Sequence, residues 1–223
     1  MRFAKSDSDW IEVSIENIVR MLVARMTAKV FMGHPVCRDN EWLKISVDFS
    51  VDLFTTAFTL KMFPPWAYPI VAHLIPARYR NKRQLAIGRK LVSGLMKKHS
   101  EAPQASDQMG HTEAEMEDTL LNWMLDNATP REKELTEMAA RQCVLTLASI
   151  HTTASNTANM IYDLCAHPEW FPILTEEVES IARELGRPLD NPEISTKQWC
   201  VRLEKLDSFF VESQRHHPVL LRK

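Results

Sequence analysis

The sequence predicts a mainly α-helical protein with little or no sheet, and three observations lead to that prediction. Glycine is rare, at five of 223 residues, whereas turn-rich β architectures need more of it. Apolar residues recur at the spacing of helical turns, and strands that alternate with a period of two are hard to find. One stretch, residues 131–167, contains neither glycine nor proline and is long enough for a helix that crosses a whole domain.

The bulk composition allows one large domain and indicates no nucleic-acid partner. Hydrophobic residues make up 45% of the chain, charged residues 25%, and the net charge is −2. The first residues lack the apolar core of a secretory signal, and no apolar run reaches the roughly 18 residues of a transmembrane helix, so we expect no anchor in this chain. The four cysteines are widely spaced, which is typical of reduced core residues in an intracellular protein.

Two amphipathic helices are predicted at the start, over residues 10–32 and 40–63. Gly33 and Pro35 stop the first, and Pro64 ends the second. The segment 64–76, "PPWAYPIVAHLIP", is too rich in proline for a long helix and too apolar for a solvated loop. It is either folded onto the core or exposed as a hydrophobic patch that contacts a membrane or an apolar ligand.

A basic helix is predicted next. Residues 78–98 contain eight Lys or Arg, and apolar residues at helical spacing give the segment a buried side. The charges then form a solvated face, and nucleic-acid binding is disfavoured because only Tyr79 could stack on a base. Residues 101–118 are polar and acidic, and they are predicted to be an exposed linker.

The long central helix has a clear predicted start. Thr129 is its N-cap, Pro130 occupies the first helical position, and Glu132 completes a capping box. Pro168 ends it. The predicted helix therefore spans residues 131–167, some 50 Å at about 1.5 Å per residue.

The centre of this helix is unusually polar. One face is apolar and is predicted to be core: Cys143, Leu147, Ile150, Ala154 and Ile161. The opposite stripe is small and polar, with His151 at its margin: Ala148, Ser149, Thr152, Ser155, Asn156 and Asn159. Hydroxyls on such a stripe can bond the carbonyl four residues back. The stripe either lines a cavity or cofactor, or it faces solvent or a closely packed helix.

Two motifs in this region resemble those of cytochrome P450 monooxygenases. "ASIHTT", residues 148–153, resembles the A-G-x-[D/E]-T-T motif of their oxygen-activating I helix, and "ESQRHHP", residues 212–218, resembles their E-x-x-R motif of helix K. "HPEWFPILTEEV" lies between them, as helix J does in the family. Upstream segments resemble fungal members that oxidise terpenoid or related secondary metabolites. The resemblance implies that residues 1–223 are a single incomplete domain of this fold, covering roughly its middle, from helices D and E to K.

The resemblance also implies roles for five residues. Thr152 matches the threonine whose hydroxyl helps to deliver protons to oxygen, and Ala148 matches the small residue beside which oxygen and substrate fit. His151 replaces the usual acid, and it either relays protons or is structural. Glu212 and Arg215 match a structural pair on the haem side of the core.

The family uses haem, an NADPH-dependent reductase and apolar substrates at the endoplasmic reticulum membrane. None of the four cysteines here lies in the pattern F-x-x-G-x-x-x-C-x-G that supplies the haem ligand. We therefore expect this chain not to bind haem and to be inactive as a monooxygenase. Histidine spacing predicts no metal site, because no H-x-x-x-H or H-E-x-x-H occurs. The alternative is a non-catalytic helical protein that binds an apolar small molecule.

Overall fold

The computed structural model describes residues 12–106, 117–188, 190–191 and 193–218, and every regular element in those ranges is a helix. This confirms the predicted fold class. The α-helices are α1 (Ile15–Met32), α2 (Asn40–Lys61), α3 (Tyr68–Leu74), α4 (Pro76–Ser106), α5 (Leu120–Asn127), α6 (Leu135–Ala166), α7 (Trp170–Leu185), α8 (Thr196–Val201) and α9 (Glu204–His216). Short 3₁₀ turns, Val36–Arg38 and Pro65–Ala67, precede α2 and α3. No helix in the described part of the chain combines the length and the apolar character needed to cross a bilayer.

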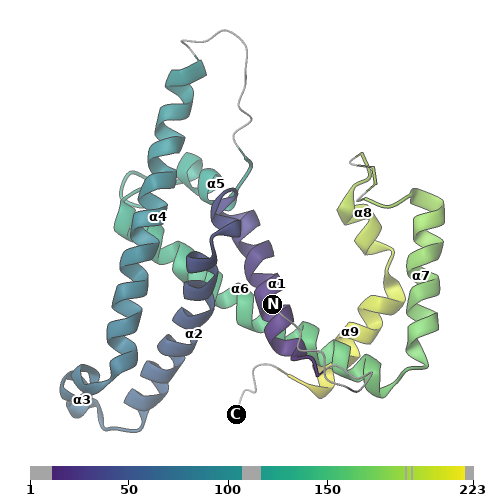
Figure 1. Cartoon of the computed structure of the whole chain (residues 1–223), viewed down its shortest axis with the longest axis horizontal. Coiled ribbons are helices and arrows are strands. Elements are labelled where there is room, and N and C mark those ends of the chain that lie inside the picture. The colour runs from purple at the N-terminus through teal and green to yellow at the C-terminus, as the bar shows by residue number, and fades with distance from the viewer. Residues whose placement is uncertain (1–11, 107–116, 189, 192, 219–223) are drawn as a thin grey trace. The chain divides into compact units, whose positions relative to one another are not determined.

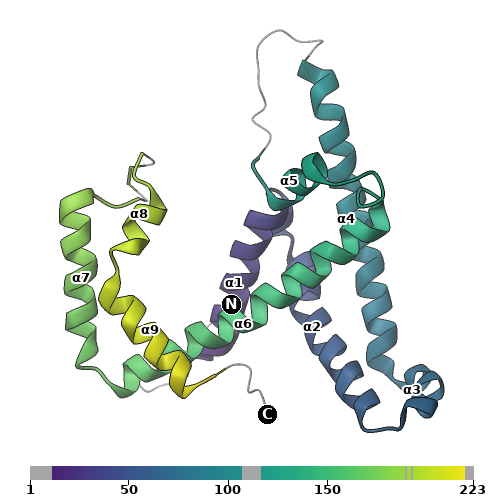
Figure 2. The same cartoon turned by 180° about the vertical axis from the view of Figure 1, so that it is seen from behind.

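The chain divides into two compact units, Met1–Thr153 and Ala154–Lys223. The first contains α1 to α5 and the longer part of α6. The second contains the end of α6 with α7, α8 and α9, of which α7 and α9 lie side by side (Figures 1 and 2). The helix α6 is therefore the element that the two units share.

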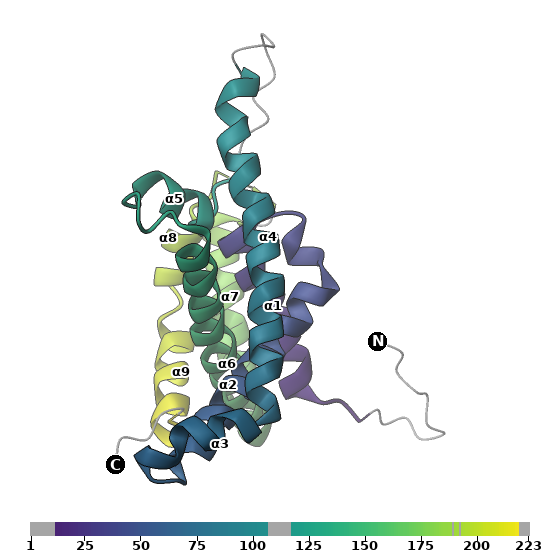
Figure 3. The ribbon, with the colours of Figure 1, turned by 90° about the vertical axis from the view of Figure 1, so that its left-hand side faces the viewer.

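The core of the first unit is a single cluster of side chains from α1, α2, α4, α5 and α6. Its fully buried members include Trp42, Leu43, Val92, Leu121, Met138 and Ile150. Gly88 of α4 lies beside Cys143 of α6. A Cβ atom at position 88 would lie 3.3 Å from the Cys143 sulfur, so glycine allows α4 to approach α6 closely. Beyond this contact, the C-terminal part of α4 extends past α5 (Figures 1 and 3).

A buried carboxylate joins α2 to α4. The Arg80 Nε donates to both carboxylate oxygens of Asp52, at 2.9 and 3.0 Å, and the amide of Gln84 adds a bond at 3.2 Å. Asp52 is buried although its partner Arg80 is largely solvated. The two helices lie side by side, and this network fixes their register (Figure 1).

The predicted start of the long helix is wrong. The helix α6 begins at Leu135, not at residue 131, and ends at Ala166. The Thr129 amide and hydroxyl both donate to one oxygen of the Glu132 carboxylate, at 3.0 and 2.7 Å, and Arg141 donates to the other oxygen at 2.9 Å. The residues after Pro130 nevertheless form turns, and at about 1.5 Å per residue the helix is some 48 Å long.

The proline-rich segment 64–76 is mostly exposed. It forms a 3₁₀ turn and α3. The interpretation of a segment folded onto the core holds only for Ala67 and Ile75, which are the buried residues of this segment. Trp66, Ile70 and Leu74 are 78%, 65% and 75% exposed. The segment therefore presents an apolar surface. Of the predicted linker 101–118, residues 101–106 continue α4 and 107–116 lie outside the described residues.

Candidate functional site

The polar centre of α6 contains a local hydrogen bond at its motif residues. The Thr152 hydroxyl donates to the Ala148 carbonyl at 2.6 Å, as expected for a threonine bonded to the carbonyl four residues back. Ala148 is exposed, and Thr152 is half-buried. The Thr152 oxygen, with its proton engaged, still has lone pairs that can accept a proton or a hydrogen bond from a neighbouring group.

His151 contacts the neighbouring helix. Its Nε2 lies 3.3 Å from the Val47 carbonyl in α2. Because a carbonyl can only accept, the imidazole must donate from Nε2, which leaves Nδ1 unprotonated in the neutral ring. Burial lowers the pKa of His151 more than the Val47 hydrogen bond raises it, with a smaller lowering from Arg20. The side chain is therefore a neutral link between α6 and α2.

An apolar groove begins beside His151 and follows α2. Its volume is about 470 Å³. The lining residues, besides His151, are Val51, Phe54, Thr55, Phe58, Thr59 and Met62. The Phe54 and Phe58 rings are stacked with their centroids 6.3 Å apart. The groove thus offers an aromatic and aliphatic wall with His151 beside it, and its two threonine hydroxyls are bonded to backbone carbonyls of α2, which suits an apolar ligand.

The two faces of α6 differ in burial. On the apolar face Cys143, Ile150 and Ala154 are buried, while Leu147 and Ile161 are half-buried. The polar stripe is half-buried at Ser149, Thr152, Ser155, Asn156 and Asn159. The stripe is thus neither solvated along its length nor enclosed.

The second pair of motif residues lies in the second unit. The Arg215 guanidinium donates from Nε and Nη2 to the two carboxylate oxygens of Glu212, at 2.8 and 2.6 Å, and His216 Nε2 lies 3.1 Å from the same carboxylate. The structure thus brings Glu212 and Arg215 together on one turn of α9. Arg215 is the main reason that the pKa of Glu212 is lowered to about 2. Both side chains are more than half exposed.

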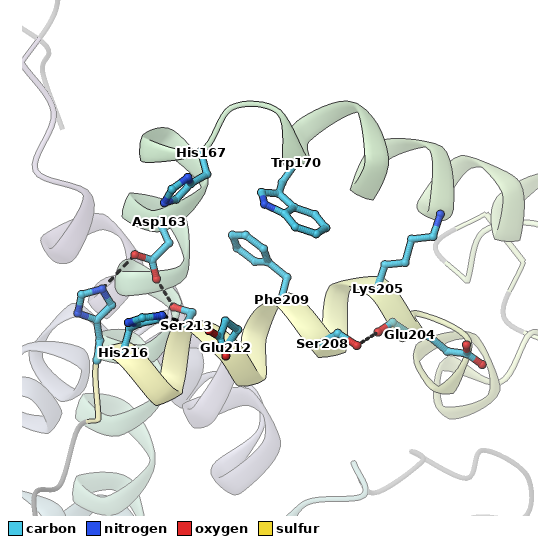
Figure 4. Close-up of a pocket in the computed structure, with 11 residues that line it drawn as sticks. Asp163, His167, Trp170, Glu204, Lys205, Ser208, Phe209, Glu212, Ser213 and His216 are labelled. Carbon is cyan, nitrogen blue, oxygen red and sulfur yellow. Dashed lines mark hydrogen bonds and ion pairs between the residues drawn. The ribbon is translucent and has the colours of Figure 1, made fainter.

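A pocket of about 840 Å³ lies beside this pair, between the end of α6, the start of α7, and α9 (Figure 4). Its apolar wall is Trp170 and Phe209, whose rings are 5.9 Å apart. Asp163 accepts bonds from the Ser213 hydroxyl at 2.5 Å and from His217 at 3.0 Å. The Ser213 bond is the main cause of the lowered pKa of Asp163.

These three residues do not form a catalytic triad. In a triad the histidine lies between serine and aspartate and takes the serine proton. Here Asp163 lies between the other two, and the Ser213 hydroxyl donates to the carboxylate instead of to His217. The cluster therefore fastens α9 to α6. Sequence reasoning missed it because the partners are 50 residues apart and share no local pattern.

The four cysteines differ in burial and in their settings. All four are free; Cys37 and Cys143 are buried as predicted, whereas Cys165 and Cys200 are exposed, so the prediction of four core cysteines is wrong for those two. Burial raises the pKa of Cys143 to about 11, which keeps the thiol protonated. The Cys37 sulfur lies in the core, 3.3 Å from Nδ1 of His34. Cys165 and Cys200 are in helices α6 and α8, not in a glycine-bearing loop.

Comparison with known proteins identifies one family. The sequence model of the family described as Cytochrome P450 matches residues 2–222. "Cytochrome P450 monooxygenase ATR4" of Stachybotrys chlorohalonatus is 37% identical over 98% of this chain and 40% of its own length. "Cytochrome P450 monooxygenase olcJ" of Penicillium canescens is 38% identical over 98% and 40%. "Ent-kaurene oxidase" of Gibberella intermedia is 35% identical over 96% and 37%. The chain thus spans about 40% of the length of these relatives.

Proposed function

The chain belongs to the cytochrome P450 family, and from that premise we propose that it is the part of a monooxygenase that carries the oxygen-activating helix and one wall of the substrate site. The substrate class we propose is an apolar, terpenoid-type metabolite, because several relatives are named ent-kaurene oxidases. The single observation that carries the proposal is the Thr152–Ala148 hydrogen bond at the centre of α6.

The proposed role of Thr152 is to place an oriented hydroxyl oxygen in a proton path at the half-buried centre of α6. Cleavage of an O–O bond needs protons brought to a site from which bulk water is excluded. A hydroxyl whose own proton is fixed on the Ala148 carbonyl keeps its oxygen oriented as an acceptor for a water or a reacting group. Ala148 leaves room beside it. His151 is proposed as the structural support of this turn, because its Nε2 proton is engaged by Val47.

Haem supplies the oxidising chemistry of the family, and we propose that its iron ligand is not one of the four cysteines of this chain. The buried, protonated thiol of Cys143 and the core position of Cys37 support this, as do the helical settings of Cys165 and Cys200. By this proposal the chain alone does not catalyse the reaction.

The apolar groove on α2 is proposed as the substrate wall. Phe54, Phe58 and Met62 offer the contact that an apolar skeleton needs, and the groove ends at His151, the neighbour of Thr152. We propose a reductase as the protein partner, because the monooxygenase reaction of the family needs a supply of electrons. We also propose that the exposed segment 64–76 contacts the endoplasmic reticulum membrane, where fungal relatives would meet their reductase.

The test compares two polypeptides, the chain of 223 residues and the longest reading frame of its transcript, each supplied with haem. We expect the carbon monoxide difference spectrum of a haem thiolate only from a polypeptide that contains an F-x-x-G-x-x-x-C-x-G loop. A thiolate spectrum from the shorter chain would refute the proposal for its cysteines.

The role of Thr152 is tested in the spectroscopically competent polypeptide with NADPH, reductase and ent-kaurene as the probe. Thr152→Ala should lower the rate of product formation by roughly 10²-fold, the lower end of what a positioned proton-transfer group contributes, and should lower the product formed per NADPH with it. Thr152→Ser, which keeps the hydroxyl, should retain most of the coupling. Equal coupling in the Ala variant and the wild type would exclude the proton role.

A second function is favoured by the same groove. If no haem-binding polypeptide exists, the α2 groove remains a site of about 470 Å³ that suits an apolar small molecule. Saturable binding of an apolar probe by the haem-free chain, lost in Phe58→Asp, would support that non-catalytic role.

A further inference from the structure

The start of α9 has no capping side chain of its own. Its N-cap residue is Leu203, which cannot accept a hydrogen bond, although the first turn of any helix leaves backbone N–H groups without helical partners. The missing acceptor comes from α7. The Lys205 and Leu206 amides donate to the Glu177 carboxylate at 2.7 and 3.0 Å.

The two bonds satisfy both oxygens of a buried carboxylate. Lys205 N–H donates to Oε1 and Leu206 N–H donates to Oε2 of Glu177. A buried charge is costly unless it is compensated, and the positive end of a helix dipole provides such compensation. The carboxylate and the helix end therefore compensate each other: Glu177 supplies the cap that α9 lacks, and the two amides of α9 pair the buried carboxylate.

The other end of α9 is fastened by a second acid. The Ser213 hydroxyl and the His217 ring both contact Asp163 of α6, at 2.5 and 3.0 Å (Figure 4). Helix α9 has 13 residues, about 20 Å at 1.5 Å per residue. It is thus held at its first turn from α7 and at its last turn from α6, and each attachment fixes its position along the axis.

We propose that Glu177 is a positioning residue, an N-cap donated by α7 that sets the position of α9 and thereby of the Glu212–Arg215 pair. The role of that pair, a structural one on the haem side of the core, is the one that the resemblance implies, and it rests on the proposed function, whereas the cap does not. The side chain of Glu177 acts on the pair only through the backbone of α9.

The cap is tested by amide hydrogen exchange, read by NMR at Lys205 and Leu206 in the whole chain. Loss of a cap costs about 1 kcal/mol, so Glu177→Ala should accelerate exchange of these two amides roughly fivefold to tenfold or more. Glu177→Gln keeps one acceptor oxygen and should give an intermediate acceleration. Helix content from circular dichroism is compared first, and the Gln variant decides the question if the Ala variant does not fold.

A rescue separates capping from general stabilisation. Leu203→Asp places an acceptor at the N-cap of α9 itself, and in the Glu177→Ala background it should return the Lys205 and Leu206 exchange rates to within a few-fold of wild type. The Arg215 Nε–H resonance should shift in Glu177→Ala and move back in the rescued variant. The matched control is Glu179→Ala, an exposed acid on the same helix, which should change neither readout.

Several outcomes would overturn the proposal. These are amides at Lys205 and Leu206 that exchange freely in the wild type, equal effects of the Glu177 and Glu179 substitutions, or no rescue by Leu203→Asp in a folded variant. An Arg215 signal that stays unchanged while the amides respond would reject the positioning role. None of these readouts needs haem or turnover, so failure of the cap and failure of the Thr152 role are seen separately.

Discussion

The imidazole of His151 is a half-buried base whose Nε2 donates to the Val47 carbonyl. Its pKa is lowered mainly by burial, so the folded chain favours the neutral ring more than the unfolded chain does. At pH values above the unfolded pKa of about 6.5 both states are neutral and the stability that depends on this neutral ring is fully present. It is lost as the pH falls through the lower, folded pKa.

This predicts a pH-dependent stability that a single substitution removes. His151→Gln retains a donor for the Val47 carbonyl but cannot be protonated in this range. The free energy of unfolding of the wild type, measured by denaturant titration from about pH 8 to pH 5, should therefore fall further on acidification than that of His151→Gln. A difference between the two free energies that is constant over this range would contradict a neutral, half-buried His151.

Gly33 ends α1 in a backbone conformation that other residues avoid. Its φ is 72° and its ψ is −160°, and its amide donates to the Ala28 and Lys29 carbonyls. A Cβ atom there would also meet the Glu117 carboxylate, which accepts a bond from the His34 amide at 2.6 Å and pairs with Lys29. The helix end therefore depends on glycine for two reasons, backbone strain and space.

We predict opposite effects for two glycine substitutions. Gly33→Ala should lower the free energy of unfolding by about 1–3 kcal/mol, the cost of placing a side chain in a glycine-only backbone region. A Cβ atom added at Gly94, inside α4, would have no other atom within 4 Å. Gly94→Ala should therefore raise the free energy of unfolding by about 0.5–1 kcal/mol. Denaturant titration measures both. Equal effects of the two would show that helix propensity alone governs the Gly33 position.

The sequence predicts helices better than it predicts what holds them together. Periodicity and proline locate α1, α2, α4 and α6, and the E-x-x-R pair does form because its residues are one turn apart. The start of α6 is misplaced although the predicted partners Thr129 and Glu132 do bond, because that local pair forms in a turn before the helix. The bonds of Glu177 and Asp163 to α9 bridge 28 and 50 residues. Pairings of that kind have no local signature in one sequence.

The same limit applies to the candidate site. Thr152 and Ala148 are recognised because their spacing is a local helical relation, and the 2.6 Å bond between them follows from it. The Val47 contact of His151 joins residues 104 apart. The sequence alone does not show this contact, and the two roles that it leaves open for His151, a proton relay and a structural residue, both stay predictions.

An apolar surface of the first unit combines aromatic exposure with exposed positive charge on the adjoining helix. Trp66, Ile70 and Leu74 are exposed on the 3₁₀ turn and α3, and Lys82 and Arg83 are exposed on the adjoining α4. Exposed apolar patches of this kind mark interaction sites. Basic residues beside the patch add attraction to anionic lipid, about 1 kcal/mol for each one near the surface.

This surface predicts binding to vesicles of phosphatidylcholine with phosphatidylinositol. Burying one large apolar side chain contributes about 1.5–3 kcal/mol, so Trp66→Ser or Leu74→Ser should each weaken the partition into vesicles roughly tenfold. Trp123→Ser is the matched control, because Trp123 is 60% exposed on α5, outside the patch, and it should bind as the wild type does. Raising the salt concentration should weaken wild-type binding by screening the basic residues. Equal losses for Trp66→Ser and Trp123→Ser in sedimentation or flotation would mean that the chain adheres through exposed tryptophan in general, and the segment 64–76 would then have no special role at a membrane.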